Sequence, residues 1–288
     1  MMTPASSASP DNHATAVRIG DLVVSRLGFG AMRITGRGVW GPPANREDAV
    51  RLLRRAVDLG VNFIDTADSY GPGVSEELIA EALAPYGNGL VIATKGGLTR
   101  PGPGEWRRDG RPEHLRTACE ASLKRLRVNR IDLYQLHSPD PRVPLEESIG
   151  ALVDLQRAGK IRYIGVSNVD ASELAAARRC ATIVSVQNRY NLSDRSSDPV
   201  LTACAGDGLA FLPWFPLSAG SDATGANRAL AEVAARHSAK PAQVAIAWLL
   251  ARSPVMLPIP GTSSLIHLEE NLQAARLQLS AADRAALD

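Results

Sequence analysis

Short apolar runs recur along the chain, and stretches with the spacing of amphipathic helices separate them. Most residues within a run are apolar without alternation, which is typical of parallel strands covered on both faces. We therefore predict eight buried β-strands, at residues 26–30, 61–65, 90–95, 131–137, 161–167, 182–187, 209–214 and 255–260.

The stretches between the runs carry the start and stop signals of helices. Asn45 is a favoured N-cap ahead of one apolar face, and Gly60 is a favoured stop after it. Asp170 and Glu173 have the spacing of a capping box at the start of another helix. Helices are predicted at residues 45–60, 75–83, 111–126, 145–160, 170–179, 198–206, 227–237, 241–252, 266–275 and 280–287.

This alternation of strands and helices favours an α/β fold, the (β/α)₈ barrel, over a doubly wound sheet. A doubly wound sheet normally carries a Gly-rich phosphate loop between its first strand and first helix. The pattern G-x-G-x-x-G occurs at residues 36–41, but two prolines follow it, so we interpret it as a flexible loop. Gly20 and Asp21 lie between two short apolar runs and predict a β-hairpin that closes the N-terminal end of the barrel.

The composition limits the classes of partner. The chain has 288 residues, 45% of them hydrophobic, so it can bury one large core. Its formal net charge of +2 gives no electrostatic reason to expect binding to nucleic acid or to an anionic membrane surface. No apolar run approaches the roughly 20 residues that span a bilayer.

The first 16 residues lack the basic and apolar regions of a secretory signal, and we expect them to form a disordered tail. One barrel domain would then occupy residues 17–288. The cysteines, Cys119, Cys180 and Cys204, are far apart and form no C-x-x-C, so we expect them to be reduced and to fill space in helices. These features predict a cytoplasmic protein without a metal site, and they leave its oligomeric state open.

Titratable side chains stand at the ends of three consecutive predicted strands. Asp65 follows the second strand, Lys95 the third and His137 the fourth. Tyr70 lies on the loop after Asp65. A barrel of this kind holds its active site at the carboxyl ends of the strands, so these side chains can converge there. Asp68, in the same loop, is interpreted as a solvated acid.

This combination of side chains suits the reduction of a carbonyl group. A lysine ammonium lowers the pKa of a neighbouring tyrosine, and an aspartate keeps the lysine charged and oriented. A histidine beside them can donate a hydrogen bond to a substrate oxygen. No side chain supplies a hydride, so this interpretation requires a nicotinamide cofactor.

Each residue alone also has an ordinary role. Asp65 could cap a helix, His137 could be a structural histidine and Tyr70 could pack the loop. Lys95 could be a strand-end lysine, or the Schiff-base nucleophile of a barrel aldolase. We favour the joint catalytic role because all four residues are expected at the same end of the barrel.

Four segments of the sequence resemble signature segments of the aldo-keto reductase family: GVNFIDTADSYG, VIATKGG, IDLYQLHSPD and IRYIGVSN. They follow the family's order, and the similarity extends from about Val17 to Leu279. The resemblance implies a (β/α)₈ barrel that binds a nicotinamide cofactor without a Rossmann domain. The catalytic tetrad that it implies, with the tyrosine as general acid, falls on Asp65, Tyr70, Lys95 and His137.

The resemblance also implies a cofactor site. Ser167, Asn168 and Gln187 would hold the carboxamide of the nicotinamide. Trp214 would stack on its ring, where the family usually has tyrosine. The full set of expected cofactor-binding residues is Gly30, Ala31, Met32, Asp65, Ser167, Asn168, Gln187, Trp214, Phe215, Pro216, Leu217, Gly220, Ile259, Gly261, Thr262, Ser263, Glu270 and Asn271.

The identity of the cofactor depends on two positions. Gly261 and His267 stand where many family members have lysine and arginine, which bind the 2′-phosphate of NADPH. NADPH is the expected cofactor on the resemblance, and NADH is the alternative because this chain has neither cation.

The substrate is expected to be a small-molecule aldehyde or ketone that receives a hydride from NADPH. Trp40 and Trp106, on the loops after the first and third strands, are expected to line its pocket together with Tyr70 and His137. Two other functions stay open. One is a cofactor-binding regulatory subunit of the same fold with slow turnover, and the other is a Schiff-base aldolase that uses Lys95.

Overall fold

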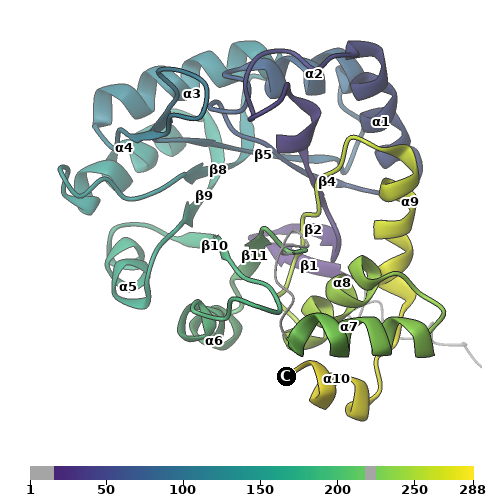
Figure 1. Cartoon of the computed structure of the whole chain (residues 1–288). Coiled ribbons are helices and arrows are strands. Elements are labelled where there is room, and N and C mark those ends of the chain that lie inside the picture. Colours follow the sequence, from purple (N-terminus) through teal and green to yellow (C-terminus); the bar gives the residue numbers. More distant parts are fainter. Residues whose placement is uncertain (1–15, 218–224) are drawn as a thin grey trace, which may run out of the picture.

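The computed structural model describes residues 16–217 and 225–288. Its main sheet consists of seven strands: β3 (Phe29–Gly30), β4 (Phe63–Asp65), β5 (Val91–Gly96), β8 (Ile131–Leu136), β9 (Ile161–Ser167), β10 (Ile183–Arg189) and β11 (Ala210–Trp214). They lie in the order β11-β10-β9-β8-β5-β4-β3, and every pair is parallel. The sheet curls into the predicted (β/α)₈ barrel, with the helices around it (Figure 1).

The segment 255–260, predicted as the eighth strand, closes the barrel without forming a regular strand. Met256 forms a single parallel bridge with Phe211 of β11. On the other side, Gly28 N donates to Pro258 O at 3.0 Å, just before β3. Pro258 and Pro260 have no N–H to donate, so the hydrogen-bond ladder cannot run through this segment.

The predicted N-terminal hairpin is present and seals one end of the barrel. Strand β1 (Ala16–Ile19) pairs with β2 (Leu22–Ser25) in antiparallel register, and Gly20 takes the left-handed conformation in the turn, with φ of 62°. The hairpin lies across the far end of the barrel in the view of Figure 1. Asp21 N donates to the hydroxyl of Tyr163 at 3.1 Å, which attaches the turn to β9.

The predicted helices are all present, with ends that differ by a few residues. Asn45 caps the first of them and accepts from Asp48 N, and Asp170 and Glu173 form the predicted capping box. The α-helices are α1 (Arg46–Asp58), α2 (Val74–Leu83), α3 (Pro112–Leu126), α4 (Leu145–Arg157), α5 (Ala171–Cys180), α6 (Asp198–Asp207), α7 (Gly225–Arg236), α8 (Pro241–Arg252), α9 (Leu265–Gln273) and α10 (Ala281–Leu287). Two short 3₁₀ helices are η2 (Ala31–Ile34) and η3 (Ala274–Arg276).

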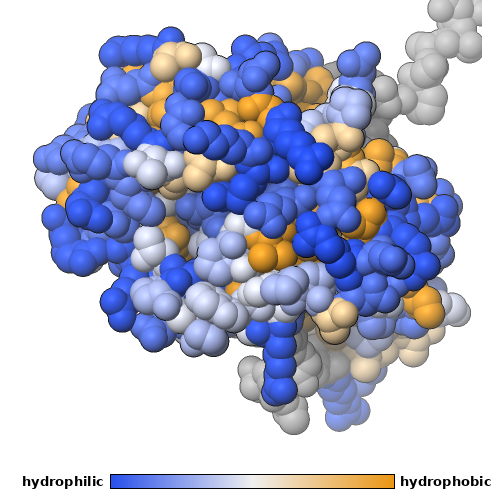
Figure 2. Space-filling view, turned by 90° about the horizontal axis from the view of Figure 1, so that it is seen from above, coloured by the Kyte–Doolittle hydropathy of each residue, from blue (hydrophilic) through white to orange (hydrophobic). Residues whose placement is uncertain are grey.

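The outer surface is consistent with helices that pack their apolar sides inward. The face seen in Figure 2 is mostly hydrophilic, with hydrophobic areas of limited size between the polar ones. In the part of the chain that the structure describes, no helix is long and apolar enough to cross a membrane.

Two loops form contacts that were not predicted. Residues 36–41, interpreted as flexible, form a closed loop in which Gly36 N donates to Gly41 O at 2.9 Å. Trp40 in this loop also bridges to Gly71. The loop after β5 contains an unpredicted antiparallel pair, β6 (Leu98–Thr99) with β7 (Arg107–Arg108).

The predicted N-terminal tail lies outside the described residues, except for Ala16, which begins β1. All three cysteines are free and lie in helices. Cys119 and Cys204 are buried as predicted, and burial raises the pKa of each thiol to about 12. Cys180 lies at the end of α5 as a free cysteine, but it is exposed, so the prediction that it fills space is wrong for this residue.

Candidate active site

Side chains from four strands, β4, β5, β8 and β10, form a buried polar layer at the carboxyl ends of the strands. Lys95 Nζ lies 2.6 Å from Asp65 Oδ2 and 2.8 Å from the backbone oxygen of Thr66. Gln135 and Gln187 donate from Nε2 to Asp65 Oδ1, at 3.2 and 2.8 Å. Asp65 therefore accepts hydrogen bonds from β5, β8 and β10, and its carboxylate connects one side of the barrel to the other.

The ion pair keeps Lys95 charged although its side chain is fully buried. Burial lowers the pKa of Lys95, but the Asp65 carboxylate and the Tyr70 hydroxyl together raise it by more. The net pKa of the lysine is therefore above its ordinary value. This supplies a fixed positive charge next to Tyr70.

Tyr70 lies on the loop between β4 and α2 and is surrounded by the charged pair and two rings. Lys95 Nζ is 5.2 Å from the centroid of the Tyr70 ring. The rings of His137 and Trp106 stand nearly perpendicular to that of Tyr70, with centroids 5.9 and 6.5 Å away. Burial raises the pKa of Tyr70, and this effect outweighs the predicted lowering by the charge of Lys95. The phenol therefore keeps its proton at neutral pH.

His137 follows β8 directly and stands beside Tyr70. Burial, reinforced by the charge of Lys95, holds the pKa of His137 well below its ordinary value, so the imidazole is neutral. Its Nδ1 lies 3.4 Å from the hydroxyl of Ser69. A neutral imidazole can donate one N–H hydrogen bond to a ligand without adding a second positive charge to the site.

A cavity of about 590 Å³ opens over Tyr70 and His137. The cavity wall includes most of the predicted cofactor residues and three that were not predicted, Arg33, Leu98 and Pro260. Among the described residues, the wall is formed by Gly30, Met32, Arg33, Asp65, Tyr70, Leu98, Trp106, His137, Ser167, Asn168, Gln187, Trp214, Phe215, Pro216, Leu217, Ile259, Pro260 and Gly261.

Asn168 organises one side of this cavity. It adopts the left-handed backbone conformation, with φ of 58°. Its Oδ1 accepts from the indole N–H of Trp214 at 2.9 Å, and its Nδ2 donates to the backbone oxygen of His137 at 2.9 Å. The amide of Asn168 thus fixes the indole that forms the wall and ties it to the loop that carries the histidine.

Several predicted residues lie away from the cavity wall. Trp40 lies beside Arg100 instead, whose guanidinium carbon is 5.5 Å from its ring centroid. Glu270 is paired with Lys240, so its carboxylate is engaged within the protein. Gly220 lies outside the described residues. The other predicted residues that are not part of the wall are Ala31, Lys95, Thr262, Ser263 and Asn271.

The β6–β7 hairpin forms another side of the cavity, through Leu98 and Trp106. The guanidinium of Arg100 stacks on Trp106, 3.8 Å from the ring centroid, and donates to the backbone oxygens of Val39 and Glu105 at 2.9 and 2.8 Å. Arg100 therefore connects the hairpin to the loop after β3 and supports the indole from behind.

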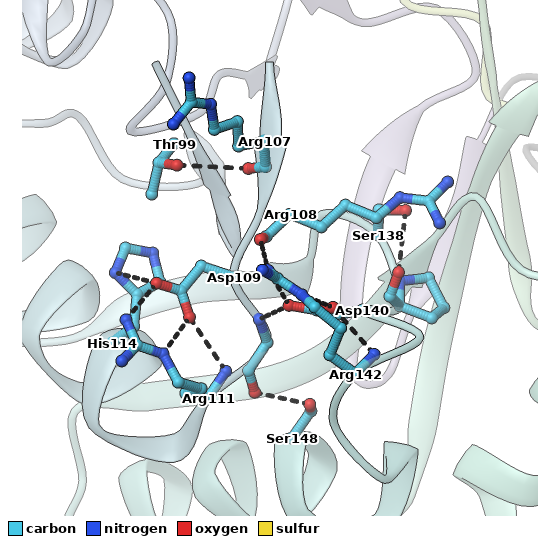
Figure 3. A network of polar contacts seen from close by, with 12 residues as sticks. Thr99, Arg107, Arg108, Asp109, Arg111, His114, Ser138, Asp140, Arg142 and Ser148 are labelled. Atoms are coloured by element: carbon cyan, nitrogen blue, oxygen red, sulfur yellow. Dashed lines mark hydrogen bonds and ion pairs between the residues drawn. The ribbon is translucent and has the colours of Figure 1, made fainter. Parts of the chain in front are cut away.

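A second set of contacts fastens the base of this hairpin to the loop after β8 (Figure 3). Asp140 Oδ2 accepts from Gly110 N at 3.2 Å, and Ser148 donates its hydroxyl to Gly110 O at 2.7 Å. Arg142 binds the Asp140 carboxylate through Nε and Nη2, at 2.9 and 2.8 Å. These hydrogen bonds hold the pKa of Asp140 well below its ordinary value. Asp140 lies three residues after His137, so the carboxylate joins the hairpin to the segment of the histidine.

Asp68 differs from its prediction as a solvated acid. Its Oδ1 is buried and has no hydrogen-bond partner among the described residues. Burial, followed by the nearby charge of Glu76, raises the pKa of Asp68 well above its ordinary value. Glu76 itself is fully buried and paired with Arg125, whose Nε is 2.7 Å from Oε2. Asp68 as a residue is half-buried, but one oxygen of its carboxyl group is shielded from solvent near the buried Glu76.

Sequence reasoning missed Gln135 and Arg33. Gln135 had a visible signal, because it is a glutamine within the apolar run IDLYQLH. Such a residue in a buried strand needs a hydrogen-bond partner, and that partner is Asp65. Arg33 follows β3 in a 3₁₀ helix, and its position on the cavity wall depends on a chain path that no periodic pattern indicates.

Known proteins are similar to this chain in both sequence and fold. An uncharacterized oxidoreductase of Schizosaccharomyces pombe is 48% identical over 99% of this chain and 93% of its own length. A pyridoxine 4-dehydrogenase of Escherichia coli is 44% identical over 91% of this chain and 93% of its own length.

Solved structures with a similar fold include a thermostable aldo-keto reductase in complex with the inhibitor epalrestat. It superposes with a TM-score of 0.85 at 34% identity, over 95% of this chain and 98% of the other. An aldo/keto reductase from Klebsiella pneumoniae in complex with NADP and acetate gives a TM-score of 0.80 at 30% identity, over 95% and 94% of the two chains. The sequence model of the aldo/keto reductase family matches residues 26–288. The chain therefore belongs to the aldo/keto reductase family of oxidoreductases.

Proposed function

We propose that this protein reduces the carbonyl group of an aldehyde or ketone with NADPH. The observation that supports this most directly is the position of Tyr70. Its protonated phenol borders the cavity beside the neutral imidazole of His137, and the charged pair of Lys95 and Asp65 stands next to it. A carbonyl oxygen held between Tyr70 and His137 would have two hydrogen-bond donors.

In this proposal Tyr70 is the general acid. Its raised pKa keeps the phenol protonated in the resting enzyme, and the nearby ammonium of Lys95 stabilises the phenolate that forms when the proton leaves. Asp65 holds Lys95 charged and in place. His137 donates a hydrogen bond to the same oxygen and orients the carbonyl group.

NADPH supplies the hydride in this proposal, and the cavity has features that fit a dinucleotide. The indole of Trp214 forms a flat wall at a fixed orientation, with Ser167 and Asn168 as polar groups nearby. A Cβ built on Gly30 would lie 2.5 Å from the oxygen of Ile259, so only glycine lets these two segments approach at the cavity wall. Solved relatives from Klebsiella pneumoniae contain NADP and NADPH, which supports the choice of NADPH.

We further propose that the substrate is an aromatic aldehyde. Trp106 and Trp214 both contribute indoles to the cavity wall, and flat rings pack well against flat walls. The E. coli relative is named a pyridoxine 4-dehydrogenase, and oxidation of pyridoxine at that carbon gives the aromatic aldehyde pyridoxal. Pyridoxal is therefore the first substrate to test.

The aldolase alternative is less consistent with the geometry. A Schiff-base lysine needs a neutral amine that a carbonyl carbon can reach. Lys95 is fully buried, paired with Asp65 and raised in pKa, and it does not line the described part of the cavity wall.

The test is turnover of the purified full chain with NADPH and three carbonyl compounds: pyridoxal, benzaldehyde and an unbranched aliphatic aldehyde. We expect NADPH to be consumed with all three, fastest with an aromatic aldehyde, and the corresponding alcohol to form in equal amount. If the chain bound NADPH but consumed it with none of the three compounds, the proposed reaction would be contradicted. A higher rate with the aliphatic aldehyde would contradict only the proposed substrate class.

A further inference from the structure

Arg33 is the single lysine or arginine among the described residues of the cavity wall. It lies in η2, directly after β3, and its side chain is exposed. Its guanidinium forms no ion pair or side-chain hydrogen bond with any other residue in the ranges 16–217 and 225–288. The cavity therefore has one cationic side chain that is not paired with an acidic group among the described residues.

The residues around Arg33 explain why the cationic side chain of the cavity comes from the segment after β3 and not from position 261. A Cβ built on Gly261 would lie 2.5 Å from the backbone oxygen of Gly30 and 3.5 Å from Cγ of Arg33. The first distance is far shorter than real Cβ contacts, so a side chain at 261 would require the backbone to shift. The stem of Arg33 lies against Gly261, where that side chain would begin.

Arg33 also stands where two hollows meet. It lines the main cavity with Pro260 and Gly261, and it lines a second hollow of about 310 Å³ with Asn45 and Ser263. The hydroxyl of Ser263, the residue before the N-cap Ser264 of α9, can donate a hydrogen bond beside the guanidinium but carries no charge. Asp48, which also borders the second hollow, is paired with Arg51.

A guanidinium in this position is suited to a phosphate group, because its planar array of N–H donors can bind two phosphate oxygens at once. If the dinucleotide has its nicotinamide over Tyr70, the rest of the molecule must extend along the cavity. One such direction runs past residues 259–261, which line the cavity wall together with Arg33.

We propose that Arg33 binds a phosphate group of the dinucleotide and replaces the cation that position 261 cannot carry. The proposal rests on the proposed function, since it assumes that the cavity binds NADPH or NADH. Two phosphate groups have the required chemistry, the 2′-phosphate that only NADPH has and the pyrophosphate that both dinucleotides share.

The test compares the binding of NADPH and NADH to the wild-type chain and to Arg33→Ala, by quenching of tryptophan fluorescence and by calorimetry. We expect the dissociation constant for NADPH to rise about tenfold or more, the loss expected for one charge-assisted contact. A change for NADPH with NADH unaffected assigns the 2′-phosphate. An equal change for both assigns the pyrophosphate.

Two further variants keep the result interpretable. Arg33→Lys keeps the charge and should recover part of the affinity. Arg18→Ala removes an exposed arginine from β1, at the opposite end of the barrel, with the same change in net charge. Unchanged affinity of Arg33→Ala for both dinucleotides, or a loss no greater than that of Arg18→Ala, would overturn the proposal. Failure of the wild-type chain to bind either dinucleotide would instead overturn the proposed function.

Discussion

The two ends of the barrel interior use the same strands for opposite purposes. Near the hairpin, the strands contribute Phe63, Ala93 and Leu133 to an apolar core. Two residues further along each of these strands stand Asp65, Lys95 and Gln135, which form the polar layer. Because side chains alternate along a strand, residues two apart point to the same side, so the interior changes from apolar to charged within one step of the pleat.

The difference shows how the fold carries a buried charge. The apolar end gains stability from burial, with the hairpin contributing Val17, Ile19 and Val24 as a plug. The polar end contains a fully buried ion pair, which by itself contributes little net stability after desolvation. We therefore expect that substitutions can damage the two ends separately.

The largest effect is expected from Lys95→Met, which leaves the buried carboxylate of Asp65 without its cation. We expect a loss of about 3–5 kcal/mol in the free energy of unfolding, the cost of an unpaired buried charge, together with loss of turnover. Denaturant unfolding and NADPH consumption measure the two quantities. The double variant Lys95→Met/Asp65→Asn should regain most of the stability and none of the turnover. If it regained no stability, the cost would not come from the unpaired charge.

The next effect concerns the apolar end. Ile19→Ala removes a fully buried side chain from the plug and should cost about 2–4 kcal/mol of unfolding free energy, because a cavity is left behind. Turnover per folded molecule should be unchanged, because the polar layer keeps its contacts. A fall in turnover at temperatures where the variant is fully folded would show that the two ends are coupled.

A smaller effect is expected at the rim of the polar end. Asp140→Asn keeps the shape of the side chain but removes the charge that fastens the hairpin base through Gly110 and Arg142. We expect the KM for the carbonyl substrate to rise about tenfold, equivalent to roughly 1.4 kcal/mol, with kcat affected less, since Trp106 would be held less firmly. Steady-state kinetics measure the split. A drop in kcat at constant KM would mean that the contact positions His137 rather than the hairpin.

The smallest effect is a gain in stability. The pKa of Asp68 is raised in the folded protein, so between about pH 4 and that raised value the folded state holds a proton that the unfolded state has lost. The carboxyl group therefore costs the wild-type protein stability as the pH rises through this window. Asp68→Asn does not titrate, and it should be more stable than wild type at pH 7 by roughly 1 kcal/mol, with little difference at pH 4. Urea unfolding at the two pH values measures this. Equal stability at both would place the carboxylate in contact with solvent.

The sequence predicted the barrel because seven of its strands are continuous apolar runs with clear helix signals between them. It overestimated the eighth segment, since Pro258 and Pro260 fit the apolar pattern but cannot donate to a ladder. It missed the β6–β7 hairpin because this segment is polar, rich in glycine and proline, and held by Arg100 and Asp140 rather than by a periodic face.

The predicted tetrad residues come together because strand ends are the most predictable positions of a barrel. Their environment was harder to predict. Whether Asp68 faces water or the interior depends on how α2 and α3 pack, and the pKa of Tyr70 depends on a burial that no local pattern reveals. The position of the Arg33 side chain beside Gly261 likewise depends on two loops that are distant in the sequence.

The most direct test of the central claim is Tyr70→Phe, which removes only the hydroxyl that we propose gives its proton to the carbonyl oxygen. The dissociation constant for NADPH and the unfolding free energy should stay close to the wild-type values. The rate of NADPH consumption at saturating aldehyde should fall by a factor on the order of 10²–10⁴, the usual contribution of a general acid. Turnover near the wild-type rate in a variant that binds NADPH normally would contradict the assignment of Tyr70 as the proton donor.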